Sequence, residues 1–261
     1  IYTALSGSFY IRKSDKSYNS EIGIPLTILG CTNAWSHIGL WLKNIIEGLL
    51  LISFKNNYPK WLVLEIGADR PGDIKKIIKW IQPDVVVLTR FSDIPAHVEF
   101  FDSPEAVREE KLSLVKALKD KGILIVNVDD EYMENIQVKT NQKILSFGLN
   151  NADISASHVH VSYDRGKVKG MSFRLNHDGK SFPSSIKNSL GNQHIYPYIA
   201  ALSVGIAEEV RITDMIEAME KHVTPPGRMR VVEGINKTQI IDDTYNSSPI
   251  AVKDALNTLG G

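Results

Sequence analysis

The chain has 261 residues, of which 43% are hydrophobic and 23% charged, and its 30 Lys and Arg residues balance 30 Asp and Glu residues. This composition is ordinary for a globular protein, and it excludes a disordered chain, a collagen and a nucleic-acid binder that works through a basic field. Cys31 is the single cysteine, so no intramolecular disulfide can form. We expect a buried thiol in a reducing compartment.

The first residue and the lengths of the apolar stretches bear on whether the chain is a fragment and whether it spans a membrane. The first residue is Ile1 and the first methionine is Met133, so we expect a fragment of a longer protein. The longest uncharged apolar stretches, such as 48–54, are far shorter than the ~20 residues that span a bilayer. We therefore expect no membrane-spanning helix.

A long helix is predicted near the N-terminus, with Asn33 as its N-cap. Large apolar side chains recur on one side of it, at Ile38, Trp41, Leu42, Ile45 and Leu49. Because an apolar stripe on a helix normally faces the core, we expect this helix to be packed in the interior.

Farther along, apolar runs rich in β-branched residues alternate with segments of helical period, which is typical of a parallel sheet covered by helices. The predicted strands are 61–66, 84–89, 123–127 and 143–148, and the predicted helices are 72–82 and 103–119. The second helix has the clearer start, because Ser103 can act as N-cap and Pro104 fits the first helical position. The pattern predicts an α/β fold.

The pattern changes from residue 153 onward. Residues 153–187 form short alternating runs separated by two hairpin-type turns, which predicts a small antiparallel sub-sheet. After it come helices at 194–209 and 213–222, a break at Pro225–Gly227, a strand at 239–242 and a helix that begins at Pro249. We therefore expect a domain over 1–223, and over 224–261 a linker with the first strand and helix of a second domain.

A glycine-rich phosphate loop is missing from this α/β pattern. Neither G-x-x-x-x-G-K-[ST] nor G-x-G-x-x-G occurs in the sequence, although such loops commonly cradle phosphates at a helix N-terminus. The nearest match, 179–181, lies in a predicted hairpin and is interpreted as a turn.

Polar side chains near the ends of two predicted strands are candidates for a site instead. Glu65 lies at the carboxyl end of the first apolar strand, and His97 lies in the loop after the second. Ligands of open α/β sheets bind beyond the carboxyl ends of the strands. A carboxylate and an imidazole there could hold a divalent cation with its phosphate ligands; the alternative is that each is an ordinary hydrogen-bonded loop residue.

Lys111 is the third candidate, because it falls on or beside the inward stripe of the helix that follows Ser103. It lies four residues after Val107 and four before Val115, whereas Glu109 and Glu110 are expected to point elsewhere. Apolar surroundings disfavour the charged amine, which makes a neutral, nucleophilic form more accessible. The alternative is a lysine that extends from the edge of the stripe into water.

An ordered set of short motifs resembles the central domain of the Mur ligases over nearly the whole chain. The motifs are 19–27 (NSEIGIPLT), 64–68 (LEIGA), 72–74 (GDI), 96–101 (AHVEFF), 127–130 (NVDD), 191–201 (GNQHIYPYIAA), 226–229 (PGRM) and 241–249 (IDDTYNSSP). Each motif is weak alone, and the order of the set carries the resemblance. It implies a central ATPase-type domain with a mostly parallel sheet flanked by helices.

The resemblance also implies roles for individual residues. Glu65 and His97 correspond to magnesium ligands of the family, and Lys111 to a lysine that is carbamylated there, so that its new carboxylate helps to hold a second magnesium ion. The implied nucleotide-side residues are Asn127, Asp130, His194, Arg228, Asp243 and Asn246, with Arg228 on the ATP phosphates and also a candidate catalytic group. Asn19 and Thr27 correspond to the muramyl-substrate side. Arg90, Ile195 and Tyr198 depart from the family pattern.

Mur ligases use ATP and Mg²⁺ to activate a carboxylate as an acyl phosphate in peptidoglycan precursor synthesis. The stretch 21–27 favours the member that joins UDP-N-acetylmuramoyl-tripeptide to D-alanyl-D-alanine, which implies a monomeric cytoplasmic enzyme without nucleic-acid partners. In the family the phosphate loop precedes the segment that resembles 1–6, so we expect this chain to lack that unit and to be inactive as given. The alternatives are a folylpolyglutamate-synthase-like or cyanophycin-synthetase-like ligase, or a degenerate, non-catalytic binding module.

Overall fold

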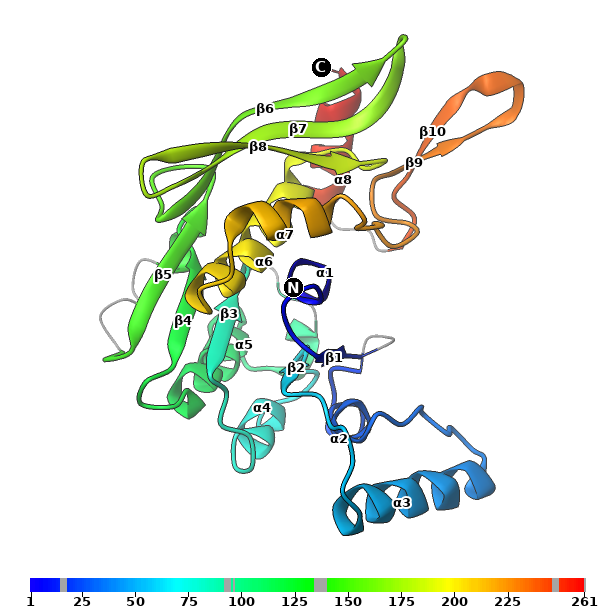
Figure 1. Cartoon of the computed structure of the whole chain (residues 1–261), viewed down its shortest axis with the longest axis vertical. Coiled ribbons are helices and arrows are strands. Elements are labelled where there is room, and N and C mark those ends of the chain that lie inside the picture. The colour runs from blue at the N-terminus through cyan, green and yellow to red at the C-terminus, as the bar shows by residue number, and fades with distance from the viewer. Residues whose placement is uncertain (15–17, 92–94, 96, 134–139, 246–248, 261) are drawn as a thin grey trace.

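The computed structural model describes residues 1–14, 18–91, 95, 97–133, 140–245 and 249–260. A six-stranded sheet with the order β3-β4-β5-β6-β7-β8 forms its centre (Figure 1). The strands are Val85–Leu88 (β3), Ile123–Asn127 (β4), Lys143–Gly148 (β5), Ile154–Asp164 (β6), Lys167–His177 (β7) and Lys180–Lys187 (β8). Pairing is parallel from β3 to the start of β6 and antiparallel from β6 to β8. The predicted parallel sheet and antiparallel sub-sheet are thus confirmed as parts of one sheet.

Two short strand pairs lie outside this sheet. β1 (Ile11–Lys13) pairs in parallel with β2 (Trp61–Val63), and β9 (Arg230–Glu233) pairs antiparallel with β10 (Gln239–Asp242). The sequence pattern predicted neither β1 nor β9. It also made β2 too long, because the ladder with the three-residue β1 ends at Val63 and leaves Glu65 in the following loop.

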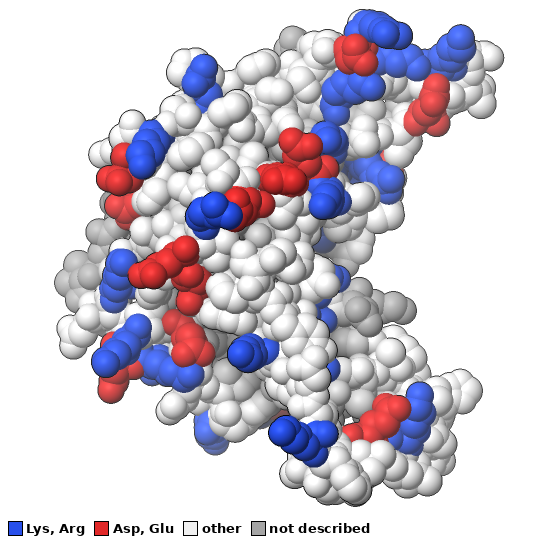
Figure 2. Space-filling view, viewed as in Figure 1, with Lys and Arg blue, Asp and Glu red and all other residues white. Residues whose placement is uncertain are grey.

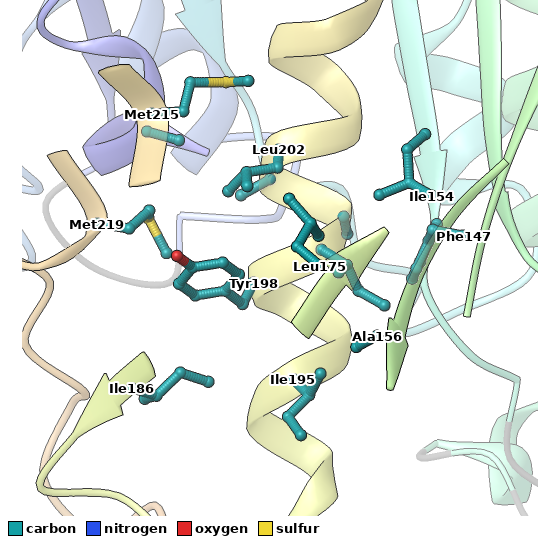
Figure 3. Packing of buried hydrophobic residues seen from close by; sticks show 14 of the residues in the cluster. Phe147, Ile154, Ala156, Leu175, Ile186, Ile195, Tyr198, Leu202, Met215 and Met219 are labelled. Carbon is teal, nitrogen blue, oxygen red and sulfur yellow. The ribbon is translucent and has the colours of Figure 1, made fainter. Parts of the chain in front are cut away.

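Helix α6 (Ile195–Ala207) is the centre of the main hydrophobic core. It lies between one face of the sheet and the helices α1 (Tyr2–Leu5) and α7 (Ile212–Met219). Figure 3 shows its side chains among those of the sheet and α7: Ile195, Tyr198 and Leu202 with Phe147, Ile154, Leu175, Met215 and Met219. Tyr198 meets the ring of Phe173 edge to face, with centroids 5.1 Å apart, and burial raises the pKa of Tyr198 to about 12. Tyr198, which departs from the family motif, is therefore a core residue.

The opposite face of the sheet packs a second apolar cluster under α5 (Pro104–Leu112) and a short 3-10 helix, Ser113–Ala117. Alternation along β4 separates the two clusters: Ile125 faces α6, whereas Leu124 and Val126 face the other side. Burial on both faces explains why this strand is continuously apolar. The 103–119 helix of the sequence prediction is one α-helix followed by that 3-10 helix.

The helix α3 (Ile38–Ser53) exists as predicted, but the expected interior packing is wrong. His37 occupies its N-cap, while Asn33 Oδ1 accepts the N–H of Trp35 at 2.9 Å. Only Asn44 and Gly48 of this helix are buried. Most of its large apolar residues are exposed instead, and Figure 1 places α3 at the margin of the molecule.

The remaining helices are α2 (Gly23–Leu29), α4 (Asp73–Ile77) and α8 (Pro249–Gly260). α4 is shorter than the predicted 72–82 helix, whereas α8 begins at Pro249 as expected. In the part of the chain that the structure describes, no helix is both long and apolar enough to cross a bilayer.

Candidate functional site

The loop after β2 and the loop after β3 approach each other through His97. Its Nε2 lies 3.4 Å from Asp69 Oδ1, and its ring is 6.4 Å from that of Phe100. His97 has a left-handed backbone (φ 63°) immediately before the 3-10 helix Val98–Phe100. Glu65 is exposed two residues beyond the end of β2. Asp69 is the carboxylate that sequence reasoning missed, although it lies only four residues after Glu65.

The donors at this edge suit a cation that takes few protein ligands. Among the residues that the structure describes, no three His, Cys, Asp or Glu side chains gather closely enough to hold a metal ion between them. Mg²⁺ ordinarily keeps several waters and takes one or two carboxylates together with substrate phosphates. The exposed pair of Asp69 and His97, with exposed Glu65 in the same loop as Asp69, therefore fits Mg²⁺ that arrives with a nucleotide better than a closed structural metal site.

Lys111 lies near the end of α5, which begins as predicted: Ser103 Oγ accepts the N–H of Ala106 at 3.3 Å, and Pro104 follows it. The Lys111 side chain is half-buried, and its Nζ is 6.0 Å from the centre of the Phe91 ring. Burial lowers the pKa of Lys111 below that of a free lysine. A larger share of its amine is therefore neutral at a given pH.

Glu110, next to Lys111, points inward, contrary to the sequence expectation. Its side chain is 3% exposed, and Oε1 accepts the backbone N–H groups of Ile74 at 2.9 Å and Lys75 at 3.1 Å. Lys75 Nζ lies 3.6 Å from Oε2. Glu110 thereby fixes α5 to the first turn of α4. Its position three residues after buried Val107 was the available signal.

Asn127 and Asp130 hold the turn that follows β4. Asn127 Oδ1 accepts the N–H of Asp129 at 3.1 Å, and Asp130 Oδ1 accepts the N–H of Tyr132 at 3.0 Å. Asp130 Oδ2 also accepts the N–H of Phe91. Both side chains are buried. The turn therefore positions Phe91, whose ring faces Lys111.

His194, Arg228 and Asp243 come together near the C-terminal end of the described chain. Asp243 Oδ1 accepts the N–H of Met229 at 3.0 Å, and the Arg228 guanidinium lies 4.0 Å from the centre of the Tyr245 ring. Burial lowers the pKa of His194, while a hydrogen bond with the Arg228 backbone and the charge of Asp243 oppose that shift. Asn246, the remaining nucleotide-side candidate, lies outside the described residues.

Two hydrogen bonds join the linker that carries Arg228 to the end of β10 and the segment after it. Asp242 Oδ2 accepts the N–H of Gly227 at 3.0 Å, and the N–H of Tyr245 donates to Gly227 O at 3.0 Å. Sequence reasoning assigned no role to Asp242 or Tyr245. Gly227 has a positive φ of 71°, and a Cβ atom there would lie 2.8 Å from the backbone nitrogen of Tyr245.

Gly227→Ala is therefore expected to lower the free energy of unfolding by about 1–2 kcal/mol, because a left-handed conformation strains an L-residue. Urea unfolding followed by circular dichroism measures this loss. Gly7→Ala is the control, since nothing lies within 4 Å of a Cβ atom added at Gly7. Equal stabilities of the two variants would contradict the strained conformation.

The two candidates on the substrate side differ in accessibility. Asn19 lies beside the loop after β2, where its carbonyl accepts the N–H of Gly67 at 3.0 Å. Thr27 is 4% exposed within α2, and its hydroxyl donates to the carbonyl of Gly23 at 3.0 Å. The structure thus places Asn19 close to the Glu65 loop, whereas the Thr27 hydroxyl is used inside its own helix.

A cavity of about 460 Å³ lies between the antiparallel part of the sheet and α8. Its lining includes the segment 191–193 and Arg90. Gly191 there has a φ of 94°. The cavity is large enough for a small organic ligand, and it is bordered by the predicted nucleotide-side segment around His194.

Residues 42–205 match the sequence model of the Mur ligase middle domain, which is more than half of the chain. The protein therefore belongs to the Mur ligase family.

Several known members of that family are similar to nearly the whole of this chain. The UDP-N-acetylmuramoyl-tripeptide–D-alanyl-D-alanine ligase of Haemophilus influenzae is 22% identical over 245 residues, which cover 94% of this chain and 46% of that protein. The corresponding Bacillus subtilis ligase is 23% identical, covering 98% of this chain and 48% of that protein. The crystal structure of the MurF ligase from Thermotoga maritima in complex with ADP is 26% identical with a TM-score of 0.76, covering 99% of this chain and 52% of that one. The chain thus spans about half the length of these relatives.

Proposed function

We propose that the protein is an ATP-dependent ligase that forms an amide bond between UDP-N-acetylmuramoyl-tripeptide and D-alanyl-D-alanine in peptidoglycan precursor synthesis. The observation that carries this proposal is the match of 99% of the chain to the ADP-bound MurF ligase of Thermotoga maritima. The ordered motifs support it, because they include the stretch 21–27 that favours this member of the family. The proposed site of action is the cytoplasm, and the proposed state is a monomer.

We propose that residues 1–223 form the central domain of this ligase and that residues 224–261 begin its C-terminal domain. The break at Pro225–Pro226 and the small β9–β10 pair beyond it support a boundary there. The contact between Gly227 and Tyr245 keeps the start of the second part folded against the linker.

The proposed metal site lies at the Glu65 loop. Glu65 and His97 would hold Mg²⁺, with Asp69 oriented toward His97, and Lys111 would contribute as its carbamate. The ion supplies electrostatic stabilisation of the phosphate oxygens. Glu110 and Phe91 position Lys111 by fixing α5 and by lining the amine.

The proposed nucleotide side is the cluster of His194, Arg228 and Asp243, with Asn246 next to it in the sequence. A guanidinium suits phosphate oxygens in both charge and geometry, and Arg228 is exposed and able to reach a ligand. Asn127 and Asp130 contribute by positioning, since their side chains hold the turn after β4. Asn19 is the proposed contact for the muramyl substrate, and Thr27 supports the helix beside it.

The proposed reaction has two steps. A carboxylate oxygen of the muramyl tripeptide attacks the γ-phosphorus of ATP, which forms an acyl phosphate and releases ADP. The amine of D-alanyl-D-alanine then attacks the acyl carbon, loses a proton and expels inorganic phosphate as the amide forms. Arg228 stabilises charge on the transferred phosphoryl group, and the site orients the reactants for both attacks.

The test is an assay of the full-length protein for ADP release with UDP-N-acetylmuramoyl-tripeptide as the acceptor. Release of more than one ADP per enzyme molecule is expected only when D-alanyl-D-alanine is also present, together with a product heavier by the dipeptide less one water in mass spectrometry. Folates with glutamate, and cyanophycin primers with aspartate or arginine, serve as competing substrate sets. Turnover of either set in place of the muramyl peptide would overturn the assignment.

A further inference from the structure

The helix α3 is attached to the molecule through Asn44 and Gly48, which are its two buried residues. Asn44 Nδ2 donates to the carbonyl of Thr32 at 2.8 Å. At Gly48, one turn farther along, a Cβ atom would lie 3.5 Å from the side chain of Leu29. A polar residue and a glycine thus face the protein, which reverses the usual arrangement of a surface helix.

Most of the large apolar side chains of α3 point away from the protein, whereas Trp41 and Leu51 are partly buried. The exposed ones are Ile38, Leu40, Leu42, Ile45, Ile46, Leu49, Leu50 and Ile52. At 100° per residue all of them except Leu40 occupy an arc of about 160° around the helix. Ile38 and Ile52, near the two ends, are 84% and 81% exposed. A continuous outward apolar face of this kind marks an interaction surface.

Aromatic and basic residues flank this apolar arc. Trp35 before the helix is 76% exposed and Phe54 after it is 66% exposed. Between residues 32 and 60 there are three lysines, at 43, 55 and 60, against one acidic residue, Glu47. Lys43 and Glu47 pair at 3.5 Å beside the arc, which leaves the other two lysines as excess positive charge. In Figure 2 this lobe, at the lower right, is mostly white with few charged side chains.

We propose that α3 and its flanking residues 35–60 dock the protein onto the surface of an anionic lipid bilayer. Apolar residues on one arc, aromatic residues at the ends and excess lysine are the features of helices that lie in the membrane interface. The 16 residues of α3 are fewer than the ~20 that would span the bilayer. The helix therefore lies in the plane of the interface, with its apolar arc toward the acyl chains.

The charge of this segment favours lipid over a second copy or another protein. Lysine is depleted in protein–protein interfaces, whereas it is attracted to the negative potential of anionic lipids. Docking through α3 also leaves the Glu65 loop and the Arg228 cluster unused, so the proposal is independent of the ligase function.

The test is flotation of the full-length protein with vesicles of phosphatidylcholine alone or with 30% phosphatidylglycerol. The unmodified protein is expected to float with the anionic vesicles, and Ile45→Asp/Leu49→Asp to bind them at least tenfold more weakly. Val223→Asp/Ile235→Asp is the matched control, because it adds the same charge at two exposed apolar positions elsewhere. It is expected to float like the unmodified protein.

Light scattering after gel filtration and circular dichroism complete the design. We expect the same mass and helix content for all three proteins. Failure of the unmodified protein to float, undiminished flotation of the α3 variant, or equal binding to neutral vesicles would each overturn the proposal. A dimer that only the α3 variant dissociates, without vesicle binding, would assign the surface to a second copy instead.

Discussion

Lys111→Ala in the full-length protein is expected to lower the rate of ADP formation with UDP-N-acetylmuramoyl-tripeptide and D-alanyl-D-alanine by about a thousandfold, the scale of losing one preorganised electrostatic group. Lys111 is half-buried against Phe91, and burial lowers its pKa. Its neutral amine can add to carbon dioxide, which forms an N–C bond and releases one proton. The carbamate carries the negative charge that the proposed metal site requires.

Chemical rescue distinguishes this role from a structural one. Short carboxylic acids such as formate or acetate are expected to restore part of the activity of Lys111→Ala, because they place a carboxylate in the space left by the side chain. Lys111→Arg is the control: it keeps a positive charge but cannot form the carbamate, and it is expected to stay inactive. Near-normal activity of Lys111→Ala would show that this lysine merely extends into water.

Glu110→Ala is expected to lower the free energy of unfolding by about 3 kcal/mol, since two N–H groups in the first turn of α4 lose their acceptor. The carboxylate is buried, and one of the two donors, Ile74, is 1% exposed. Water therefore replaces the lost hydrogen bonds poorly. Urea unfolding followed by circular dichroism or tryptophan fluorescence measures the change.

Glu109→Ala is the matched control, because its exposed neighbouring carboxylate has the same chemistry without the burial. It is expected to change stability by less than about 0.5 kcal/mol. Glu110→Gln should fall between the two, since an amide oxygen can still accept from α4. A Glu110→Ala protein as stable as the Glu109→Ala protein would contradict the anchoring of α5 by this side chain.

The sequence predicts the centre of the sheet well, because β3 and β4 pack against apolar clusters on both faces and are almost entirely apolar. Short elements were not predictable in this way. β1 has three residues, and only its pairing with Trp61–Val63 makes it a strand. The interior packing expected for α3 failed for a different reason: periodicity locates an apolar face but does not determine what that face contacts.

The residues of the candidate site also divide into those that the sequence pattern could identify and those that it could not. Lys111 was identifiable because a charged residue interrupts an apolar stripe, and His97 because it follows a strand. Glu110 and Asp69 were missed because their importance depends on partners far apart in the sequence, 36 residues in the case of Ile74 and Glu110. Such partners become visible only once the helices and loops are assembled.

The contacts between residues 227 and 245 have a mechanical consequence. Gly227 bonds to Asp242 and Tyr245, and Met229 bonds to Asp243, so both ends of the β9–β10 hairpin are tied together. Such a closed loop rotates as one piece. A rotation of the β9–β10 hairpin about its base would therefore carry the Arg228 backbone with it or break these three hydrogen bonds.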